Sequence, residues 1–127
     1  MRKILNFINS NHFNNYESLL KIFTGKITTD IDNALKLLSL DEIFNISKDY
    51  IDNLGIHFTA MLSDERLANA SLFIAQLANT IVSKSFKIDS LASTSTLSMD
   101  TRNFIIRMLY YYTPYGNNFE LNRKATG

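Results

Sequence analysis

The sequence has no cysteine and no tryptophan, one proline, and only four glycines among its 127 residues. Without cysteine, the chain cannot form disulfides, cysteine metal sites or thiol nucleophiles. Proline and glycine are the residues that most often interrupt helices, so their scarcity leaves few forced helix ends. These absences exclude cysteine chemistry and favour continuous secondary structure.

An excess of charge of one sign is also missing. Thirteen basic and twelve acidic residues give a net charge of +1, whereas nucleic-acid-binding domains usually concentrate positive charge on one face. The longest apolar runs are a few residues, far below the roughly 20 that span a membrane. Polar residues soon follow the basic start at 1–5, which a signal peptide would not allow. We therefore expect a cytoplasmic protein with no nucleic-acid partner and no membrane span.

The chain has the length and composition of one packed domain. Apolar residues make up 46% of it and charged residues 20%, which is ordinary for a globular protein. No linker, repeat or low-complexity domain boundary divides it. We predict a single helical domain over 1–127, with the polar residues 116–127 as a flexible tail.

Apolar residues recur at helical spacing nearly throughout the sequence. This periodicity predicts an all-α fold without a sheet, a globin-like bundle of about six helices. The expected helices cover 2–9, 15–24, about 29–39, 42–62, 64–86 and 87–113. The last segment is compatible with one long helix or with two, because Ser98 and Asp100 resemble a new helix start. The stretch from Ser39 to Glu42 fits a capping box at the start of the helix 42–62. Gly55, within that predicted helix, indicates a close helix crossing or a ligand near the backbone.

Candidate catalytic groups have simpler structural interpretations. His12 is expected in a polar turn and His57 at the flank of the helix 42–62. Neither has a second ligand at metal-site spacing. Most acidic pairs stand at predicted helix starts, where capping explains them. The serines and threonines of 93–98 lack a nucleophile motif. We expect no enzyme, no catalytic residue, no metal and no cofactor.

The segment Asn45-Ile46-Ser47-Lys48-Asp49-Tyr50-Ile51-Asp52 resembles the haem-less sensor-globin domains of bacterial stressosome regulators and sporulation sensor histidine kinases. Residues 4–8 are similar to the opening of those domains, and 16–23 to their second helix. Residues 70–82 look like their F helix, and 87–112 like their G helix. Haem would need a histidine on the F-like helix, and residues 64–84 contain none.

The resemblance implies a regulatory function without catalysis. It predicts an apolar interior that binds a fatty-acid-like ligand, a sensor kinase or other signalling protein as partner, and a homodimer. The ligand would contact residues of three predicted helices: Leu54, Phe58, Met61, Ile74, Leu77, Ala78, Ile81, Leu91, Ile105 and Ile106. The alternative is that these residues simply fill a solid core.

A second hypothesis comes from a different class of protein. The stretch Ser71-Leu72-Phe73-Ile74 before Ala78 loosely resembles viral Bcl-2-like inhibitors, which bind an amphipathic partner helix in a groove. A bacteriocin-immunity or phage helical bundle is a further alternative. In each of these the function is partner binding rather than ligand sensing.

Overall fold

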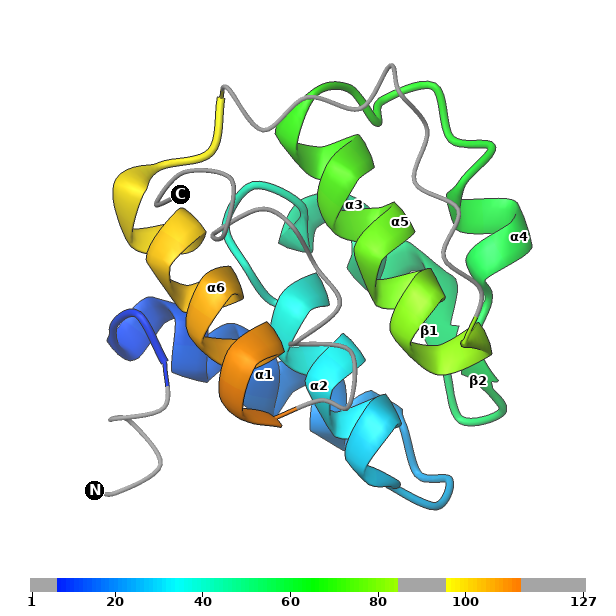
Figure 1. Cartoon of the computed structure of the whole chain (residues 1–127). Helices are drawn as coiled ribbons and strands as arrows, with labels where there is room; N and C mark the ends of the chain where they lie inside the picture. The colour runs from blue at the N-terminus through cyan, green and yellow to red at the C-terminus, as the bar shows by residue number, and fades with distance from the viewer. Residues whose placement is uncertain (1–6, 85–95, 113–127) are drawn as a thin grey trace.

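A computed structural model describes residues 7–84 and 96–112 (Figure 1). The elements in chain order are α1 (Ser10–Ile22), α2 (Thr29–Leu38), α3 (Phe44–Ser47), the 3-10 turn η2 (Lys48–Tyr50), β1 (Ile51–Asp52), β2 (Gly55–Ile56), α4 (Phe58–Met61), α5 (Ala70–Ser83) and α6 (Met99–Tyr112). The prediction of a mostly helical domain is confirmed. The prediction of no sheet was wrong, because β1 and β2 pair as a small antiparallel hairpin.

Helix α2 lies at the centre of the fold. It contacts α1, α5 and α6, and the run from Asn33 to Leu35 is buried, as are Leu37 and Leu38. Its apolar residues recur at helical spacing, whereas Asp30, Asp32 and Lys36 are only partly buried, as expected for an amphipathic helix. The Thr28 hydroxyl accepts a hydrogen bond from the Ile31 amide and caps the helix. The helix predicted over about 29–39 is confirmed.

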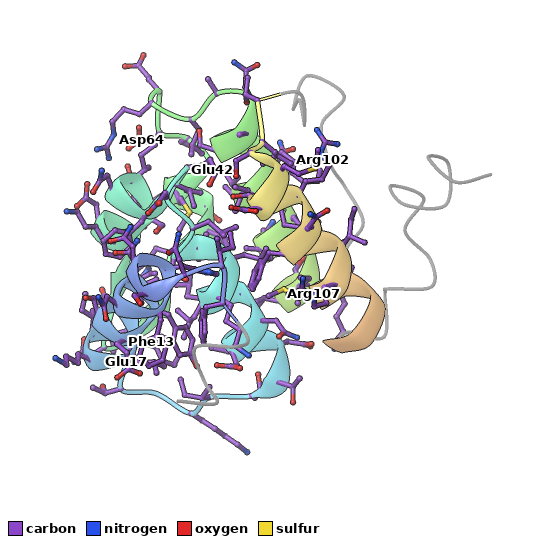
Figure 2. The ribbon with its side chains drawn as sticks, turned by 90° about the vertical axis from the view of Figure 1, so that its left-hand side faces the viewer. Phe13, Glu17, Glu42, Asp64, Arg102 and Arg107 are labelled. Carbon is purple, nitrogen blue, oxygen red and sulfur yellow. The ribbon has the colours of Figure 1, made fainter. Side chains whose placement is uncertain are left out.

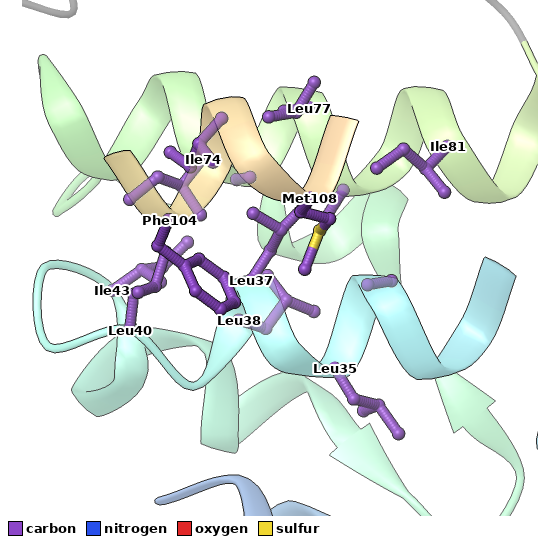
Figure 3. Packing of buried hydrophobic residues seen from close by; sticks show 14 of the residues in the cluster. Leu35, Leu37, Leu38, Leu40, Ile43, Ile74, Leu77, Ile81, Phe104 and Met108 are labelled. Carbon is purple, nitrogen blue, oxygen red and sulfur yellow. The ribbon is translucent and has the colours of Figure 1, made fainter. Parts of the chain in front are cut away.

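The hydrophobic core fills the space between α2, α5 and α6 (Figure 3). From α5, Ile74, Leu77 and Ile81 are fully buried, and they recur at the spacing that places side chains on one helix face. Met108 of α6 and Leu37 of α2 are buried in the same cluster. Burying side chains of this size contributes about 1.5–3 kcal/mol each, so this cluster holds the three helices together.

The single helix predicted over 42–62 was wrong. Ser39 does not start a helix: it is the C-cap of α2, and its hydroxyl donates to the Lys36 carbonyl. Further on, the Asp52 carboxylate accepts hydrogen bonds from the amides of Leu54 and Gly55. Such a local side-chain-to-backbone bond competes with helix formation. Gly55 has a φ of +152°, which favours glycine, so this residue makes the hairpin turn rather than a helix crossing.

Three other boundaries differ from the predictions. Residues 7–9 are not helical and α1 begins at Ser10, so the helix predicted over 2–9 is wrong there; residues 1–6 lie outside the described residues. Helix α5 begins at Ala70, six residues later than predicted. Because 96–98 are not helical and α6 begins at Met99, one continuous helix over 87–113 was wrong, and the new start at Ser98 is confirmed.

The predicted tail, 116–127, also lies outside the described part of the chain. Across the ranges that are described, the helices are too short or too polar for any of them to span a membrane.

Candidate functional site

Two hollows lie side by side where the residues around the start of α1 face the first half of α6. The larger, of about 330 Å³, is lined by Ile8, Asn9, His12, Leu40, Asp41, Glu42, Thr96, Ser98, Asp100 and Thr101. The smaller, of about 190 Å³, is lined by Phe7, Ile8, Asp100, Asn103, Phe104 and Arg107. Because both include Ile8 and Asp100, we treat them as one feature, the α1–α6 groove.

Glu42 positions the start of α6 beside the groove. One carboxylate oxygen accepts a hydrogen bond from the Thr101 hydroxyl at 3.0 Å, and the other faces the Ser98 amide at 3.4 Å. The Ser98 hydroxyl in turn accepts from the Thr101 amide at 3.1 Å and caps the helix. Figure 2 shows Glu42 beside the start of α6 and Arg107 further along the same helix. A carboxylate at a helix N-terminus also interacts favourably with the helix dipole.

His12 forms part of the wall of the larger hollow. The expectation that it lies in a polar turn was wrong, since it belongs to α1 and is only 2% exposed. Its Nδ1 accepts a hydrogen bond from the Ile8 amide at 3.2 Å, and its Nε2 lies 2.8 Å from the Lys36 carbonyl oxygen. Burial lowers the pKa of His12 below its usual 6.5, although the Lys36 carbonyl, Asp41 and Glu42 act in the opposite direction. His12 is therefore a neutral, fully bonded histidine at neutral pH.

Aromatic rings form the floor beneath the N-terminal wall. The Phe7 ring lies edge-on to His12, with 4.9 Å between centroids, and the Phe104 ring lies edge-on to His12 from the α6 side at 4.7 Å. Phe7 also contacts Tyr16 at 4.9 Å. Edge-to-face contacts of this length stabilise aromatic pairs. These ring contacts link α1 to α6, and Phe7 and Phe104 line the smaller hollow of the groove.

The rim of the groove is acidic. The described ranges hold ten acidic residues, and five of them pair with Lys, Arg or His. Of the five that have no such partner, three line the larger hollow, namely Asp41, Glu42 and Asp100. Asp41 accepts hydrogen bonds from Asn11 and Asn15, which carry no charge. Three of the described acidic residues that lack an ion-pair partner therefore lie together at the larger hollow, and the cation Arg107 lines the smaller one.

The predicted ligand-contacting residues do not line this groove. Six of them are buried together in the core: Met61, Ile74, Leu77, Ala78, Ile81 and Ile105. Phe58 and Ile106 are partly buried. Leu54 lies at the hairpin turn and is 84% exposed, and Leu91 lies outside the described residues. Neither of the two hollows includes any of these residues.

Several charged groups away from the groove have structural partners. Arg66 bridges Asp49 at 3.1 Å and Asp64 at 2.8 Å, and the Tyr50 hydroxyl donates to Asp64 at 2.5 Å. Hydrogen bonds from Arg66 and Tyr50 hold the pKa of Asp64 well below its usual range. His57 is exposed and lies 2.8 Å from Asp52, so its expected place on a helix was wrong. Within the described ranges, no cluster of three potential ligands could hold a metal ion.

Sequence reasoning missed the two residues that organise the groove. His12 was placed in a turn because neighbouring asparagines obscured the helix that Asn9 caps. Glu42 was assigned to a capping box with Ser39, whereas its partners, Ser98 and Thr101, lie 56 and 59 residues away. The available signal was the helix start at Ser98, because a helix N-terminus favours a nearby carboxylate.

Searches against protein families, curated proteins and solved structures give no match for this chain.

Proposed function

We propose that this chain is a non-enzymatic interaction protein whose α1–α6 groove binds a basic peptide segment of a partner protein. The observation that carries the proposal is a hollow lined by three acidic residues, Asp41, Glu42 and Asp100, that form no ion pair with a cation among the described residues. Uncompensated charge attracts a partner of opposite sign and selects against others.

The dimensions of the groove suit a side chain and its neighbours. A hollow of about 330 Å³ lies at the lower end of the range for ligand sites, roughly 300–1,000 Å³. An arginine side chain can pack its apolar stem along Ile8 and present its guanidinium to carboxylates at the rim. The smaller hollow, between Phe7 and Arg107, extends the surface for the next residues of the same segment.

The imidazole and the hydroxyls in the groove take part in structural hydrogen bonds. Both ring nitrogens of His12 have partners within hydrogen-bond distance. The Ser98 hydroxyl donates to the Thr101 hydroxyl and accepts from the Thr101 amide, and the Thr101 hydroxyl donates to Glu42. A general base or nucleophile needs a free nitrogen or hydroxyl directed at the substrate. These hydrogen bonds favour a binding function over catalysis.

Selection from a displayed peptide library tests the proposal. Wild-type protein should enrich peptides in which arginine or lysine stands beside apolar residues. The double variant Asp41→Asn with Asp100→Asn should bind those peptides at least about tenfold more weakly, the loss expected for charge-assisted hydrogen bonds.

The matched control is Glu17→Gln with Glu65→Gln, which removes the other two acidic residues of the described ranges that have no cationic partner there. This control should bind the selected peptides like the wild type. Enrichment of neutral or acidic peptides, or equal binding by both double variants, would contradict the proposal.

The fatty-acid-sensing function is a second candidate. It is favoured by one observation: six of the predicted contact residues, Met61, Ile74, Leu77, Ala78, Ile81 and Ile105, gather in one apolar cluster. A ligand that binds there must raise the melting temperature in a concentration-dependent way. Melts with added long-chain fatty acid test this candidate, and an unchanged melting temperature at every concentration would contradict it.

A further inference from the structure

Three parts of the chain meet on the ring of His12. The Ile8 amide, in the segment before α1, reaches Nδ1 at 3.2 Å. The Lys36 carbonyl of α2 lies 2.8 Å from Nε2. The Phe104 ring of α6 packs edge-on against the imidazole. This one side chain therefore ties the N-terminal wall of the groove to the central helix and to α6.

The two backbone partners determine the tautomer of the ring. An amide N–H can only donate, so Nδ1 must be unprotonated and accept. A carbonyl can only accept, so Nε2 must carry the proton. The neutral Nε2–H form is the only form of His12 that satisfies both partners. A proton added at Nδ1 places two donors, the ring N–H and the Ile8 N–H, against each other.

We propose that His12 is a proton-operated latch on the α1–α6 groove. Proton uptake from solvent at Nδ1 breaks the bond to the Ile8 amide and releases residues 7–9 from α1. Ile8 lines both hollows, so its release alters the whole N-terminal wall and weakens ligand binding. The inference rests on the proposed function, because the latch regulates the same groove.

The charges around His12 set how strongly the latch is held. Asp41 and Glu42, in the loop after α2, favour the protonated ring, whereas Lys36 on α2 disfavours it. Asp100 of α6 lines the same hollow, and Arg107 lines its neighbour. Burial outweighs the carboxylates and keeps the ring neutral until the solution is more acidic than an exposed histidine would require.

Nuclear magnetic resonance of the free protein tests the latch without any ligand. At pH 7, ring nitrogen shifts should show the neutral Nε2–H tautomer of His12. As the pH falls toward 4.5, the ring should titrate below 6.5, and hydrogen exchange of the Ile8 amide, corrected for its intrinsic rate, should rise about tenfold with the same midpoint. His12→Gln should abolish this pH response, and His57→Gln should leave it intact.

Three results of that experiment would overturn the inference. They are an Nδ1–H tautomer at pH 7, a ring that stays neutral until the protein unfolds, and a titrating ring with unchanged exchange at Ile8.

Peptide binding then separates the latch from the proposed function. A selected basic peptide should bind wild type about tenfold more weakly below the His12 midpoint than at pH 7, and His12→Gln should lack that change. Binding independent of pH, together with a responding Ile8 amide, would overturn regulation by the latch. No binding at any pH, together with the expected ring titration, would overturn the proposed function and leave the proton-driven release of Ile8 standing.

Discussion

Truncating Glu42 to alanine should destabilise the fold through the start of α6. The variant removes the acceptor of the Thr101 hydroxyl at 3.0 Å and the weaker contact to the Ser98 amide at 3.4 Å. A hydrogen bond to a charged acceptor contributes about 1.5–3 kcal/mol. The carboxylate's interaction with the helix dipole adds about 0.3–1 kcal/mol. Thr101 keeps one partner, the Ser98 hydroxyl, which places the expected loss at about 2–3 kcal/mol.

Thermal melting followed by circular dichroism measures this loss. For a chain of this length, about 4 °C corresponds to 1 kcal/mol, so Glu42→Ala should melt about 8–12 °C below wild type. Glu42→Gln, which keeps one acceptor oxygen, should lose roughly half as much. The control Glu65→Ala removes an exposed carboxylate and should stay within about 0.5 kcal/mol of wild type. If Glu42→Ala has the same melting temperature as Glu65→Ala, Glu42 does not stabilise the start of α6 and the reasoning is wrong.

Three further variants test other parts of the structure. The folded-state pKa of His12 is lowered, so as the pH falls the unfolded chain takes up the extra proton first. The free energy of unfolding should therefore fall as the pH drops below 6.5, by up to about 1.4 kcal/mol per pH unit. Urea titrations of His12→Gln should lack this component. Asn69 has φ 50° and ψ −116° in a turn closed by the Ser71 amide, a conformation that favours glycine. Asn69→Gly should therefore raise the melting temperature by about 2–4 °C. A decrease would show that the asparagine is unstrained. Ala78→Phe should cost about 1–3 kcal/mol or more in urea unfolding if the core is solid, whereas a modest cost with loss of fatty-acid stabilisation would show a cavity.

The sequence predicted the helical class and the helices whose signals are local. The α2 helix was predicted because a capping side chain and the apolar spacing after it act within a few residues, although the cap is Thr28 rather than the expected Thr29 or Asp30. The start of α6 at Ser98 was recognisable for the same reason. Such signals are readable because capping and periodicity depend only on neighbours along the chain.

The region after α2 could not be predicted from the same rules. Its apolar spacing from Ile43 to Met61 fits a helix, yet the Asp52 carboxylate and Gly55 form a turn in its middle. The turn forms in place of the helix because the Asp52 carboxylate accepts hydrogen bonds from two backbone amides, which a helix would not allow. This misassignment also placed Leu54 inside, whereas it is exposed at the turn.

The candidate site was beyond sequence reasoning because its contacts are long-range. Glu42 meets residues more than fifty positions away, and His12 becomes a wall residue only when α2 and α6 pack against α1. Among the described residues Asp41 and Asp100 have no cationic ion-pair partner, which is likewise a property of the folded chain. Composition gave a balanced net charge of +1, which conceals the local concentration of acidic residues.

The most direct test of the central claim is to map where a selected basic peptide binds. Titration of the ¹⁵N-labelled protein should shift amide resonances at 7–12, 40–42 and 96–107, the segments that border the groove. The shifts should saturate together and weaken at least about tenfold in affinity in the Asp41→Asn, Asp100→Asn variant. Shifts confined to the hairpin around Leu54 or to α5, or saturation unaffected by that variant, would contradict the account.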